Sequence, residues 1–312
     1  MIFKKPLFWD TKKQGVFSII LFPFTILTNI NNFLLAISNK KINHKIFSIC
    51  IGNIYVGGTG KTPLAIKLCQ ILNKNHKGVV VGKKFYSSHI DEINLLKNKV
   101  HTLIKNKRSS IIQEAIKKNK KIIIFDDGLQ DKELKYDLNF VCFDSLNWIG
   151  NGNLIPAGPL REKINSLKKF DAVFLKNILK PNDKIIRIIK KINPKIKIFN
   201  TRYKISNINK FNLKDKYLIF SGIGNPDSFI EVLKKNKFLI KDQFIFPDHY
   251  NYTGKDFLNI IERSKELNTK IITTEKDFIK IPKRYKKKIK CLKVDLEIDN
   301  QKKLINFINE KI

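Results

Sequence analysis

The sequence predicts an α/β protein in which a P-loop NTPase-like parallel sheet domain is followed by a second, smaller α/β domain. Three observations support this fold. A glycine-rich turn lies between an apolar run and a helical pattern, further apolar runs alternate with helical patterns, and the alternation resumes after a proline-bounded segment at residues 181–194. Strands that alternate with helices form βαβ units, whose parallel sheets bind ligands at the carboxyl ends of the strands.

The glycine-rich turn is Gly57-Gly58-Thr59-Gly60-Lys61-Thr62, which follows the apolar run at residues 46–51 and precedes a helical pattern. Backbone N–H groups of such a loop and the positive helix end face an anion, Lys61 adds a point charge, and the Thr62 hydroxyl can hold Mg²⁺. The pattern G-x-x-x-x-G-K-[ST] asks for glycine where Tyr55 stands. We interpret the turn as a nucleoside triphosphate site; the alternative is a glycine turn that happens to precede Lys-Thr.

Length, composition and charge limit the classes of protein. The chain has 312 residues, enough for two domains with their own cores, and its 43% hydrophobic and 28% charged residues are typical of a folded protein. The net charge of +34 is mostly due to lysine and invites a nucleic-acid or anionic-membrane partner. The alternative is a bias of composition, because lysine, asparagine and isoleucine are abundant along the whole chain. Arginine, which makes bidentate contacts in many nucleic-acid readers, is scarce, so we favour an acidic or membrane-surface partner over nucleic acid.

The four cysteines are scattered along the chain without a C-x-x-C pair, and three of them lie in apolar runs: Cys50, Cys69, Cys142 and Cys291. This pattern predicts reduced, buried thiols in a cytosolic protein, in place of disulfides or a zinc site.

An apolar segment at residues 16–37 precedes the glycine-rich turn, with Pro23 and several polar residues inside it. Its uninterrupted apolar part is too short to cross a bilayer, the whole segment is too polar, and no signal-peptide cleavage site follows. Lysines flank it on both sides: Lys12, Lys13, Lys40, Lys41 and Lys45. We predict a helix that lies in the cytoplasmic interface of a membrane. The alternative is a core helix packed on the nucleotide domain.

Strands and helices then alternate along the chain. We predict strands at residues 78–82, 120–127, 138–143, 172–175, 217–220 and 270–273, and helices at 111–119, 181–194 and 254–267. A polar turn with His89, Asp91 and Glu92 follows the first of these strands. We place a membrane-contact segment at residues 1–45, the P-loop domain at 46–203 and the smaller domain at 204–312.

Paired carboxylates, Asp126 and Asp127, end a buried strand. A P-loop needs a metal partner, usually an acid in this position, so we predict a metal or nucleotide role for at least one of them. Because Gly128 follows, capping of the next turn is the alternative.

Residues 150–162 form a loop with three glycines, two prolines and the pair Arg161 and Glu162. A backbone specified position by position usually shapes a site. Arg161 could clamp a phosphate and Glu162 could reach the metal, whereas the alternative is a rigid surface turn without a ligand.

His249 lies beside Asp248 in the second half of the chain. A lone histidine is more often structural, but beside an acid it can transfer protons, because its unperturbed pKa is close to neutrality. Asp91 and Glu92, taken alone, are ordinary loop acids.

Together these motifs resemble the tetraacyldisaccharide 4′-kinase family, the lipid A 4′-kinases of Gram-negative bacteria. The matching segments follow the family's order and lie at residues 52–53, 56–63, 126–130, 150–152, 154–162, 222–226, 248–249 and 274–277. The resemblance implies ATP- and Mg²⁺-dependent phosphorylation of the 4′-hydroxyl of a tetraacyldisaccharide 1-phosphate, a lipid A precursor, at the cytoplasmic face of the inner membrane. We infer no nucleic-acid partner and no obligate protein partner.

The resemblance also assigns residues to the nucleotide site. It implies that Lys61 and Thr62 take phosphate and Mg²⁺, that Asp126 and Asp127 support metal and nucleotide, and that Glu162 aids the metal. One departure lies here: the histidine that usually closes the Asp-Asp-Gly-Leu-Gln motif is Asp131.

The family's catalytic pair, an aspartate in Gly-Asp-Glu-Pro and the histidine of Asp-His, falls on Asp91 and His249. We expect Asp91, oriented with His249, to accept the sugar hydroxyl proton, and closure of the two domains to assemble the pair. The surroundings depart from the family: Gly-Asp-Glu-Pro reads Ile90-Asp91-Glu92-Ile93, and Ser-Arg-Gly-Tyr-Gly reads Gly82-Lys83-Lys84-Phe85-Tyr86.

Two other functions remain open from the residues. A membrane-associated regulatory ATPase with a deviant P-loop carries a signature lysine where Val56 stands, so the sequence argues against it. A basic nucleic-acid-binding module would use the net charge, and its affinity would fall steeply with salt.

Overall fold

The structure is a computed structural model that describes residues 5–11, 15–37, 44–131, 134–177 and 181–312. Its contacts divide the chain into two units. The large unit comprises Lys5–Tyr86, Lys99–Arg202 and Ile298–Ile312, and the small unit comprises Ser87–Asn98 and Tyr203–Glu297. Two segments differ from the predicted domains. Residues 87–98, predicted in the P-loop domain, group with the small unit, and residues 298–312, predicted in the smaller domain, group with the large unit.

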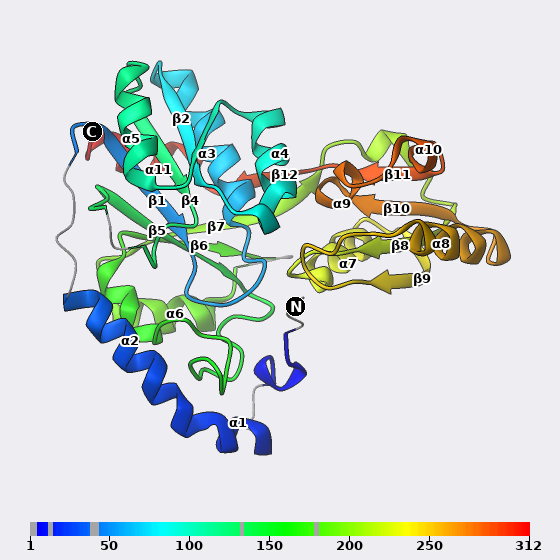
Figure 1. Cartoon of the computed structure of the whole chain (residues 1–312), viewed down its shortest axis with the longest axis horizontal. Coiled ribbons are helices and arrows are strands. Elements are labelled where there is room, and N and C mark those ends of the chain that lie inside the picture. The colour runs from blue at the N-terminus through cyan, green and yellow to red at the C-terminus, as the bar shows by residue number, and fades with distance from the viewer. Residues whose placement is uncertain (1–4, 12–14, 38–43, 132–133, 178–180) are drawn as a thin grey trace. The chain divides into compact units, whose positions relative to one another are not determined.

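The large unit is built on an eight-stranded sheet in the order β12-β7-β6-β5-β1-β4-β2-β3 (Figure 1). Its strands are β1 (Phe47–Gly52), β2 (Val79–Lys84), β3 (Thr102–Lys105), β4 (Ile122–Asp126), β5 (Leu138–Asp144), β6 (Ala172–Lys176), β7 (Lys197–Ile205) and β12 (Val294–Ile298). Ile49 of β1 pairs with Ile124 of β4 and Leu138 of β5, both in parallel. The carboxyl ends of β1 and β4 therefore lie at one edge of the sheet.

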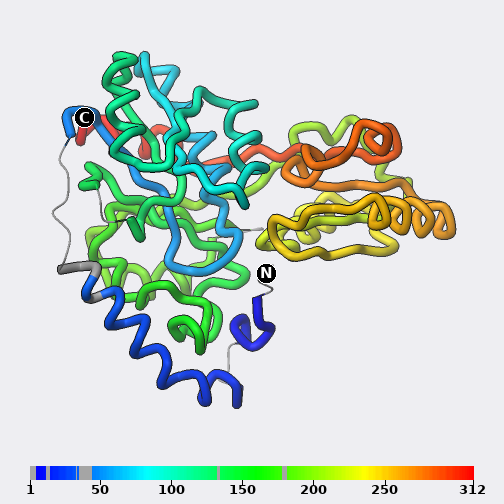
Figure 2. The backbone as a smooth tube through the Cα atoms, in the orientation of Figure 1, coloured from blue at the N-terminus to red at the C-terminus, as the bar shows by residue number. Residues whose placement is uncertain are grey.

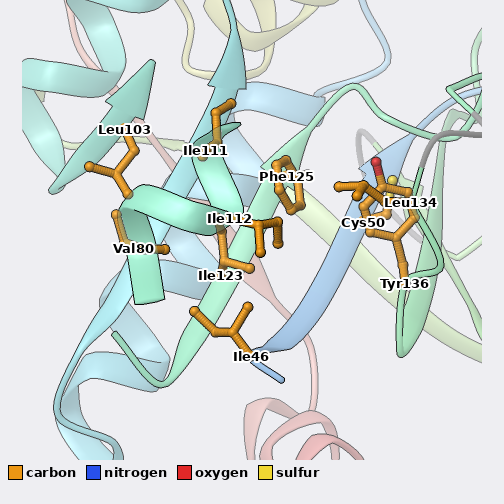
Figure 3. Packing of buried hydrophobic residues seen from close by; sticks show 11 residues of the cluster. Ile46, Cys50, Val80, Leu103, Ile111, Ile112, Ile123, Phe125, Leu134 and Tyr136 are labelled. Atoms are coloured by element: carbon orange, nitrogen blue, oxygen red, sulfur yellow. The ribbon is translucent and has the colours of Figure 1, made fainter. Parts of the chain in front are cut away.

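Apolar side chains of alternate residues cover the two faces of this sheet. Val80 and Ile123 pack with Ile111 and Ile112 of α5 (Arg108–Lys117) in one cluster (Figure 3). A second cluster joins the sheet to α6 (Asp183–Ile192) and contains Val141, Val173, Ile185 and Ile189. Both clusters lie on the same face. Val80 pairs with Ile123, and Ile123 pairs with Ser48 of β1. Cys50 follows Ser48 by two and pairs with Asn139, which Val141 follows by two, so their side chains share that face.

The C-terminal helix α11 (Gln301–Asn309) packs against the large sheet, and the red end of the tube in Figure 2 traces it. Phe307 of this helix contacts Phe140 and Phe199. Phe140 is the neighbour of Val141 on β5, and successive side chains of a strand point to opposite faces. Helices α11 and α6 therefore cover opposite faces of the sheet.

The small unit contains a four-stranded parallel sheet in the order β11-β10-β8-β9. Its strands are β8 (Lys216–Ser221), β9 (Leu239–Ile245), β10 (Lys270–Thr274) and β11 (Ile289–Leu292). Ile219 packs with Phe229 of α7 (Pro226–Lys235), whereas the adjacent Phe220 packs with Phe257 of α8 (Gly254–Glu266). Helices therefore cover both faces of this sheet as well. Its remaining helices are α4 (Ile90–Lys99), α9 (Glu275–Ile279) and α10 (Lys283–Lys286).

The predicted strands and helices are present, with ends that differ by a few residues. The predicted polar turn around Asp91 is wrong in part: a single 3₁₀ turn, Ser87–His89, is followed by α4, which carries Asp91 and Glu92 in its first turn. Cys50, Cys69 and Cys142 are buried and Cys291 is half-buried, and no cysteine is in a disulfide, as predicted.

The N-terminal segment forms two helices, α1 (Val16–Leu21) and α2 (Thr25–Ile37), joined by a 3₁₀ turn that contains Pro23. Their polar atoms contact residues 155–161: the Ser18 hydroxyl donates to the Ala157 carbonyl at 2.7 Å, and the Thr28 hydroxyl to Ile155 at 2.6 Å. The apolar side chains point away from the protein and are more than 45% exposed at Val16, Phe17, Ile19, Ile20, Phe22, Phe24, Ile26, Leu27, Ile30 and Leu34.

The segment is therefore not a core helix packed through its apolar face. No helix among the described residues is long and apolar enough to cross a membrane. Of the flanking lysines, Lys12, Lys13, Lys40 and Lys41 lie outside the described residues.

Candidate active site

The glycine-rich turn connects β1 to α3 (Lys61–Asn75), as predicted. Gly60 precedes the helix with a φ of 89°, a left-handed conformation that favours glycine. The Leu64 amide donates to the Gly60 carbonyl at 3.1 Å, so the first helical turn starts at this residue. The free N–H groups of a helix start therefore lie directly after the glycines, where they can bind an anion.

Tyr55 occupies the position at which the general P-loop pattern has glycine, and its side chain is a packing element. The residue is 3% exposed and contacts Leu154 and Leu160. The Tyr55 hydroxyl donates to the Asp10 carboxylate and accepts from Lys5 at 2.9 Å. Tyr55 therefore ties the start of the loop to the N-terminal segment and to the loop of residues 150–162.

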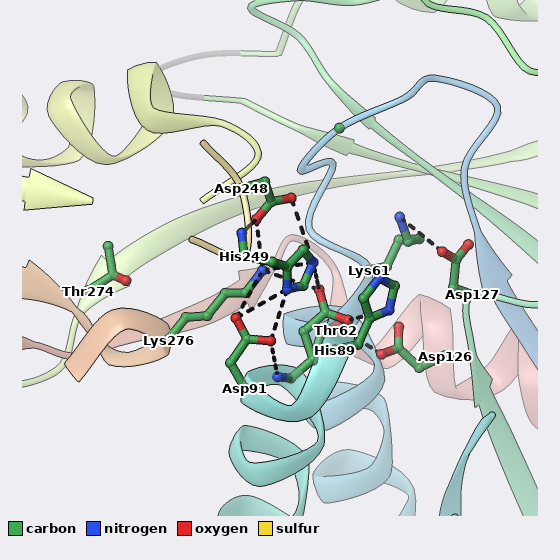
Figure 4. Close-up of polar contacts among 12 residues, drawn as sticks. Lys61, Thr62, His89, Asp91, Asp126, Asp127, Asp248, His249, Thr274 and Lys276 are labelled. Atoms are coloured by element: carbon green, nitrogen blue, oxygen red, sulfur yellow. Dashed lines mark hydrogen bonds and ion pairs between the residues drawn. The ribbon is translucent and has the colours of Figure 1, made fainter. Parts of the chain in front are cut away.

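Two carboxylates at the end of β4 face the start of α3 (Figure 4). The Thr62 hydroxyl donates to Asp126 Oδ2 at 2.8 Å, and Lys61 Nζ lies 3.6 Å from Asp127 Oδ2. Asp127 has a φ of 62°, and its amide donates to the carbonyl of Ile51 at 2.8 Å. The paired acids are thus fixed beside the P-loop, as the sequence predicts.

Lys83 is a further member of this site that the sequence analysis did not single out for a role. Its Nζ lies 2.6 Å from Asp126 Oδ2, and the two side chains are 4% and 0% exposed. The other oxygen, Asp126 Oδ1, is buried without a hydrogen-bond partner among the described residues. One Asp126 oxygen therefore holds a hydroxyl and an ammonium, and the other is available to a cation.

Arg161 and Glu162 join the same site through Gln130. Arg161 Nη1 donates to Gln130 Oε1 at 3.0 Å and lies 3.7 Å from Asp127 Oδ1. Gln130 Nε2 donates to the Asn53 carbonyl at 2.7 Å and lies 3.5 Å from Glu162 Oε1. The predicted phosphate and metal residues of the large unit are thus brought together.

The oxygen atoms of Thr62, Asp126 and Asp127 fit Mg²⁺, which prefers oxygen ligands. The described residues hold no cluster of three or more His, Cys, Asp and Glu side chains suited to a metal. Mg²⁺ is usually held by one or two carboxylates together with substrate phosphates, so this donor set suits a metal that arrives with a nucleotide.

A second group of polar residues lies in the small unit and joins Asp91 to His249. His249 Nδ1 lies 3.0 Å from Asp91 Oδ1 and 3.2 Å from Asp91 Oδ2. Asp91 comes from the first turn of α4 and is 6% exposed. His249 has a φ of 57°, and its amide donates to Asp248 Oδ1 at 3.0 Å. The pair predicted to come from both domains belongs to one unit.

Two lysines that the sequence analysis gave no role contact Asp91. Lys276, on α9, lies 3.7 Å from Asp91 Oδ2, and Lys280, directly after α9, lies 3.0 Å from the same oxygen. Burial alone raises the pKa of Asp91, but the hydrogen bond from His249 and the charges of Lys276 and Lys280 together hold that pKa well below its usual range. Asp91 is therefore ionised at neutral pH.

Lys276 is also the centre of a wider cluster. Its Nζ lies 2.9 Å from Asp248 Oδ1, 3.4 Å from Glu92 Oε1 and 3.4 Å from His249 Nε2. Burial alone lowers the pKa of Lys276, but the carboxylates of Glu92, Asp248 and Asp91 hold that pKa above its ordinary value. The ammonium therefore stays charged.

The comparisons with known proteins agree with this arrangement. The chain matches the family LpxK, described as tetraacyldisaccharide-1-P 4′-kinase, over residues 17–90 and 79–312. A tetraacyldisaccharide 4′-kinase of Pelagibacter ubique is 47% identical over all of both chains. One of Rickettsia canadensis is 35% identical, with 98% of this chain and 96% of the relative covered.

A solved structure shares the fold. The crystal structure of LpxK from Aquifex aeolicus in complex with ATP has a TM-score of 0.68 and 23% identity, with 94% of this chain and 99% of that chain covered.

Proposed function

Because the chain belongs to the LpxK family of tetraacyldisaccharide 4′-kinases, we propose that it transfers the γ-phosphoryl group of ATP to a lipid A precursor. The acceptor is the 4′-hydroxyl of a tetraacyldisaccharide 1-phosphate. The observation that carries this proposal is the P-loop at the start of α3, with Thr62 bonded to Asp126 and Lys61 beside Asp127. Phosphoryl transfer depends mainly on positioning and on neutralising charge, and these residues supply both.

The nucleotide site consists of groups that bind phosphate and groups that bind the metal. The backbone N–H groups of residues 57–62 and the Lys61 ammonium bind the phosphates, and Arg161 adds a planar guanidinium. Thr62, Asp126, Asp127 and Glu162 would provide oxygen ligands for Mg²⁺. When bound, Mg²⁺ neutralises charge that develops on the transferred group.

Asp91 is the proposed base for the sugar hydroxyl. It is ionised, and His249 Nδ1 lies 3.0 Å from its Oδ1, a contact that orients the carboxylate. A carboxylate with a low pKa is a weak base in the ground state. It takes the proton late, as the hydroxyl becomes acidic in the transition state.

The N-terminal helices are the proposed contact with the membrane that holds this substrate. On their polar face, Ser18 and Thr28 donate hydrogen bonds to the loop of residues 150–162, and their apolar face is exposed. A helix with an exposed apolar face and flanking lysines binds an anionic interface, so we place the enzyme at the cytoplasmic surface of the inner membrane.

The test is transfer of radiolabelled phosphate from ATP to the lipid disaccharide in detergent micelles. We expect transfer by the wild type and a fall in kcat of about 100-fold or more for Asp91→Asn, because a general base typically contributes that much. Lys283→Gln is the matched control, since Lys283 is exposed on α10. Wild-type kcat in Asp91→Asn would remove the role of Asp91 and leave the kinase proposal intact.

The same assay separates the other functions. A regulatory ATPase would hydrolyse ATP without labelling the lipid. A nucleic-acid-binding module would do neither, and its affinity for any duplex would fall steeply with salt.

A further inference from the structure

His249 has five charged or aromatic neighbours, all within the small unit. The His89 ring stacks on it with centroids 4.5 Å apart. Asp91 faces Nδ1, whereas Lys276 faces Nε2 at 3.4 Å (Figure 4). The remaining two neighbours are carboxylates near Nε2: Glu92 Oε1 at 3.6 Å and Asp248 Oδ2 at 3.8 Å. Of these five neighbours, only the lysine lies within hydrogen-bond distance of Nε2.

The chemistry of these partners decides where the imidazole proton lies. A lysine ammonium has three donors and no acceptor, so a nitrogen that bonds to it must offer a lone pair. In a neutral imidazole, one nitrogen donates and the other accepts. If Nε2 accepts from Lys276, then Nδ1 carries the hydrogen and donates to the Asp91 carboxylate.

We propose that Lys276 is a positioning residue that fixes His249 as the Nδ1–H tautomer, so that His249 donates a hydrogen bond to Asp91. The inference rests on the proposed function only in giving Asp91 its catalytic role. Lys276 is well placed for this task. It is held by Asp248 at 2.9 Å, and its side chain is 14% exposed.

The carboxylates around Nε2 make the lysine necessary. Without the ammonium, Glu92 and Asp248 would accept a hydrogen from Nε2, and the ring would turn to the other tautomer or become doubly protonated. Because the ring is stacked on His89 and faces Asp91 at 3.0 Å, we expect it to keep its position in the variant. The proton moves instead.

The tautomer can be measured directly. Long-range ¹H–¹⁵N correlations of protein with ¹⁵N-labelled histidine distinguish a ring nitrogen that carries hydrogen from one that does not. The chain has five histidines, and the His249 signals are assigned by their loss in His249→Gln. We expect the Nδ1–H tautomer in the wild-type enzyme at pH 8, and loss of that signature in Lys276→Met.

Two variants serve as controls. Lys280→Met removes the other lysine that contacts Asp91. Lys280 contacts Asp91 and the Tyr250 carbonyl and not Nε2 of His249, so the tautomer should stay unchanged. Lys276→Arg keeps a donor-only cation and should retain the Nδ1–H tautomer if it folds. Circular dichroism checks that each variant folds. The ¹H–¹⁵N correlations of the wild type test whether His249 is the Nδ1–H tautomer without any variant.

The proposal is overturned if the wild-type ring is the Nε2–H tautomer or doubly protonated at pH 8. It is also overturned if Lys276→Met keeps the Nδ1–H signature, or if Lys280→Met loses it equally.

Activity gives a second readout. We expect kcat of Lys276→Met to fall about 10- to 100-fold, the cost known for losing a group that orients a metal-ligating histidine, with the KM for ATP unchanged. If the wild type labels no lipid while the tautomer follows Lys276, the proposed function fails and this inference stands. If lipid is labelled and the tautomer does not depend on Lys276, the proposed function stands and this inference fails.

Discussion

At the scale of single residues, charges are buried along one edge of the large sheet. Asp126 ends β4, Asp144 ends β5 and Lys176 ends β6, while Lys83 precedes the last residue of β2. Lys83 pairs with Asp126 at 2.6 Å and Lys176 with Asp144 at 2.5 Å, and all four side chains are at most 5% exposed. Buried pairs of this kind contribute little net stability, because desolvation offsets their attraction. Their position at the carboxyl ends of the strands, beside the P-loop, points to a role in holding the site's charge.

Lys83→Gln should lower the free energy of unfolding by about 3–5 kcal/mol, since it leaves the Asp126 carboxylate buried without its ammonium. Mg²⁺ with ATP should then raise Tm more in the variant than in the wild type, because the added cation replaces the lost charge. The measurement is thermal unfolding with and without Mg²⁺ and ATP.

Lys84→Gln is the control for this change, because Lys84 is the next residue and only half-buried. An unaltered Tm in Lys83→Gln would show that Asp126 does not need the ammonium. An equal gain from Mg²⁺ with ATP in both proteins would exclude a shared cation position.

The buried thiols give a prediction about pH. Burial raises the pKa of Cys69 to about 11 and raises the pKa values of Cys50 and Cys142 further. Because the thiolate is the reactive form, iodoacetamide at pH 8 should modify native protein at the half-buried Cys291 alone. Unfolding in guanidinium should expose all four thiols, and mass spectrometry counts them. Modification of Cys50 in the native protein would contradict the burial.

The sign of the alkaline effect follows from the same shift. A group whose pKa is raised by folding contributes its full stability below the unfolded pKa, which is 9.0 for the Cys69 thiol, and loses it as the pH rises through about 11. The Cys69 contribution to the free energy of unfolding should therefore be constant below pH 9.

At the scale of elements, apolar runs were the informative signal. Strands such as β4, with four apolar residues before Asp126, were predicted because a buried parallel strand needs such a run. The short β3 and β11 were not predicted, since lysines and polar residues interrupt their apolar positions. The sequence predicts a polar turn where helix α4 lies, because acids and asparagines are common in loops.

The candidate site divides in the same way. The phosphate and metal residues are predictable because the P-loop and the end of a buried strand are local patterns. Lys276 contacts Asp91 across 185 positions of sequence, and a single sequence carries no local signal for such a contact. The match of residues 274–277 to the family was the available hint.

Tyr55→Gly would restore the general P-loop pattern, yet we expect it to weaken the protein. The variant loses a 3%-exposed aromatic ring, which costs about 3–5 kcal/mol in most cores. It also releases residues 5–10, because the Tyr55 hydroxyl binds Lys5 and Asp10.

Denaturant unfolding measures the loss of stability, and proteolysis at the N-terminal segment measures its release. Tyr55→Phe is the matched variant that keeps the ring and removes the hydroxyl bonds. Unchanged stability in Tyr55→Gly would mean that the loop needs no anchor at this position.

At the scale of the whole molecule, two properties of the chain support the proposed contact with an anionic membrane surface. One is the net charge of +34. The other is the exposed apolar face of α1 and α2. The hydroxyls of Ser18 and Thr28 on these helices bond to the rest of the large unit, so the apolar side chains are left exposed. Lysines attract anionic headgroups over a Debye length, and apolar side chains then enter the interface.

This combination predicts how the protein binds vesicles that contain phosphatidylglycerol. Phe17 and Ile20 are 67% and 60% exposed, so replacing both with serine removes apolar area that would enter the lipid. Burial of such a side chain is worth about 1.5–3 kcal/mol, and we expect vesicle affinity to fall about 100-fold or more in the double variant. Ile116→Ser is the control, because Ile116 is 46% exposed on α5.

Co-sedimentation across a salt series separates the two contributions: salt should weaken binding of every protein, whereas only the double variant should bind weakly at low salt. Equal loss in Ile116→Ser, or binding that depends on salt alone, would show that charge without the helices holds the enzyme at the membrane.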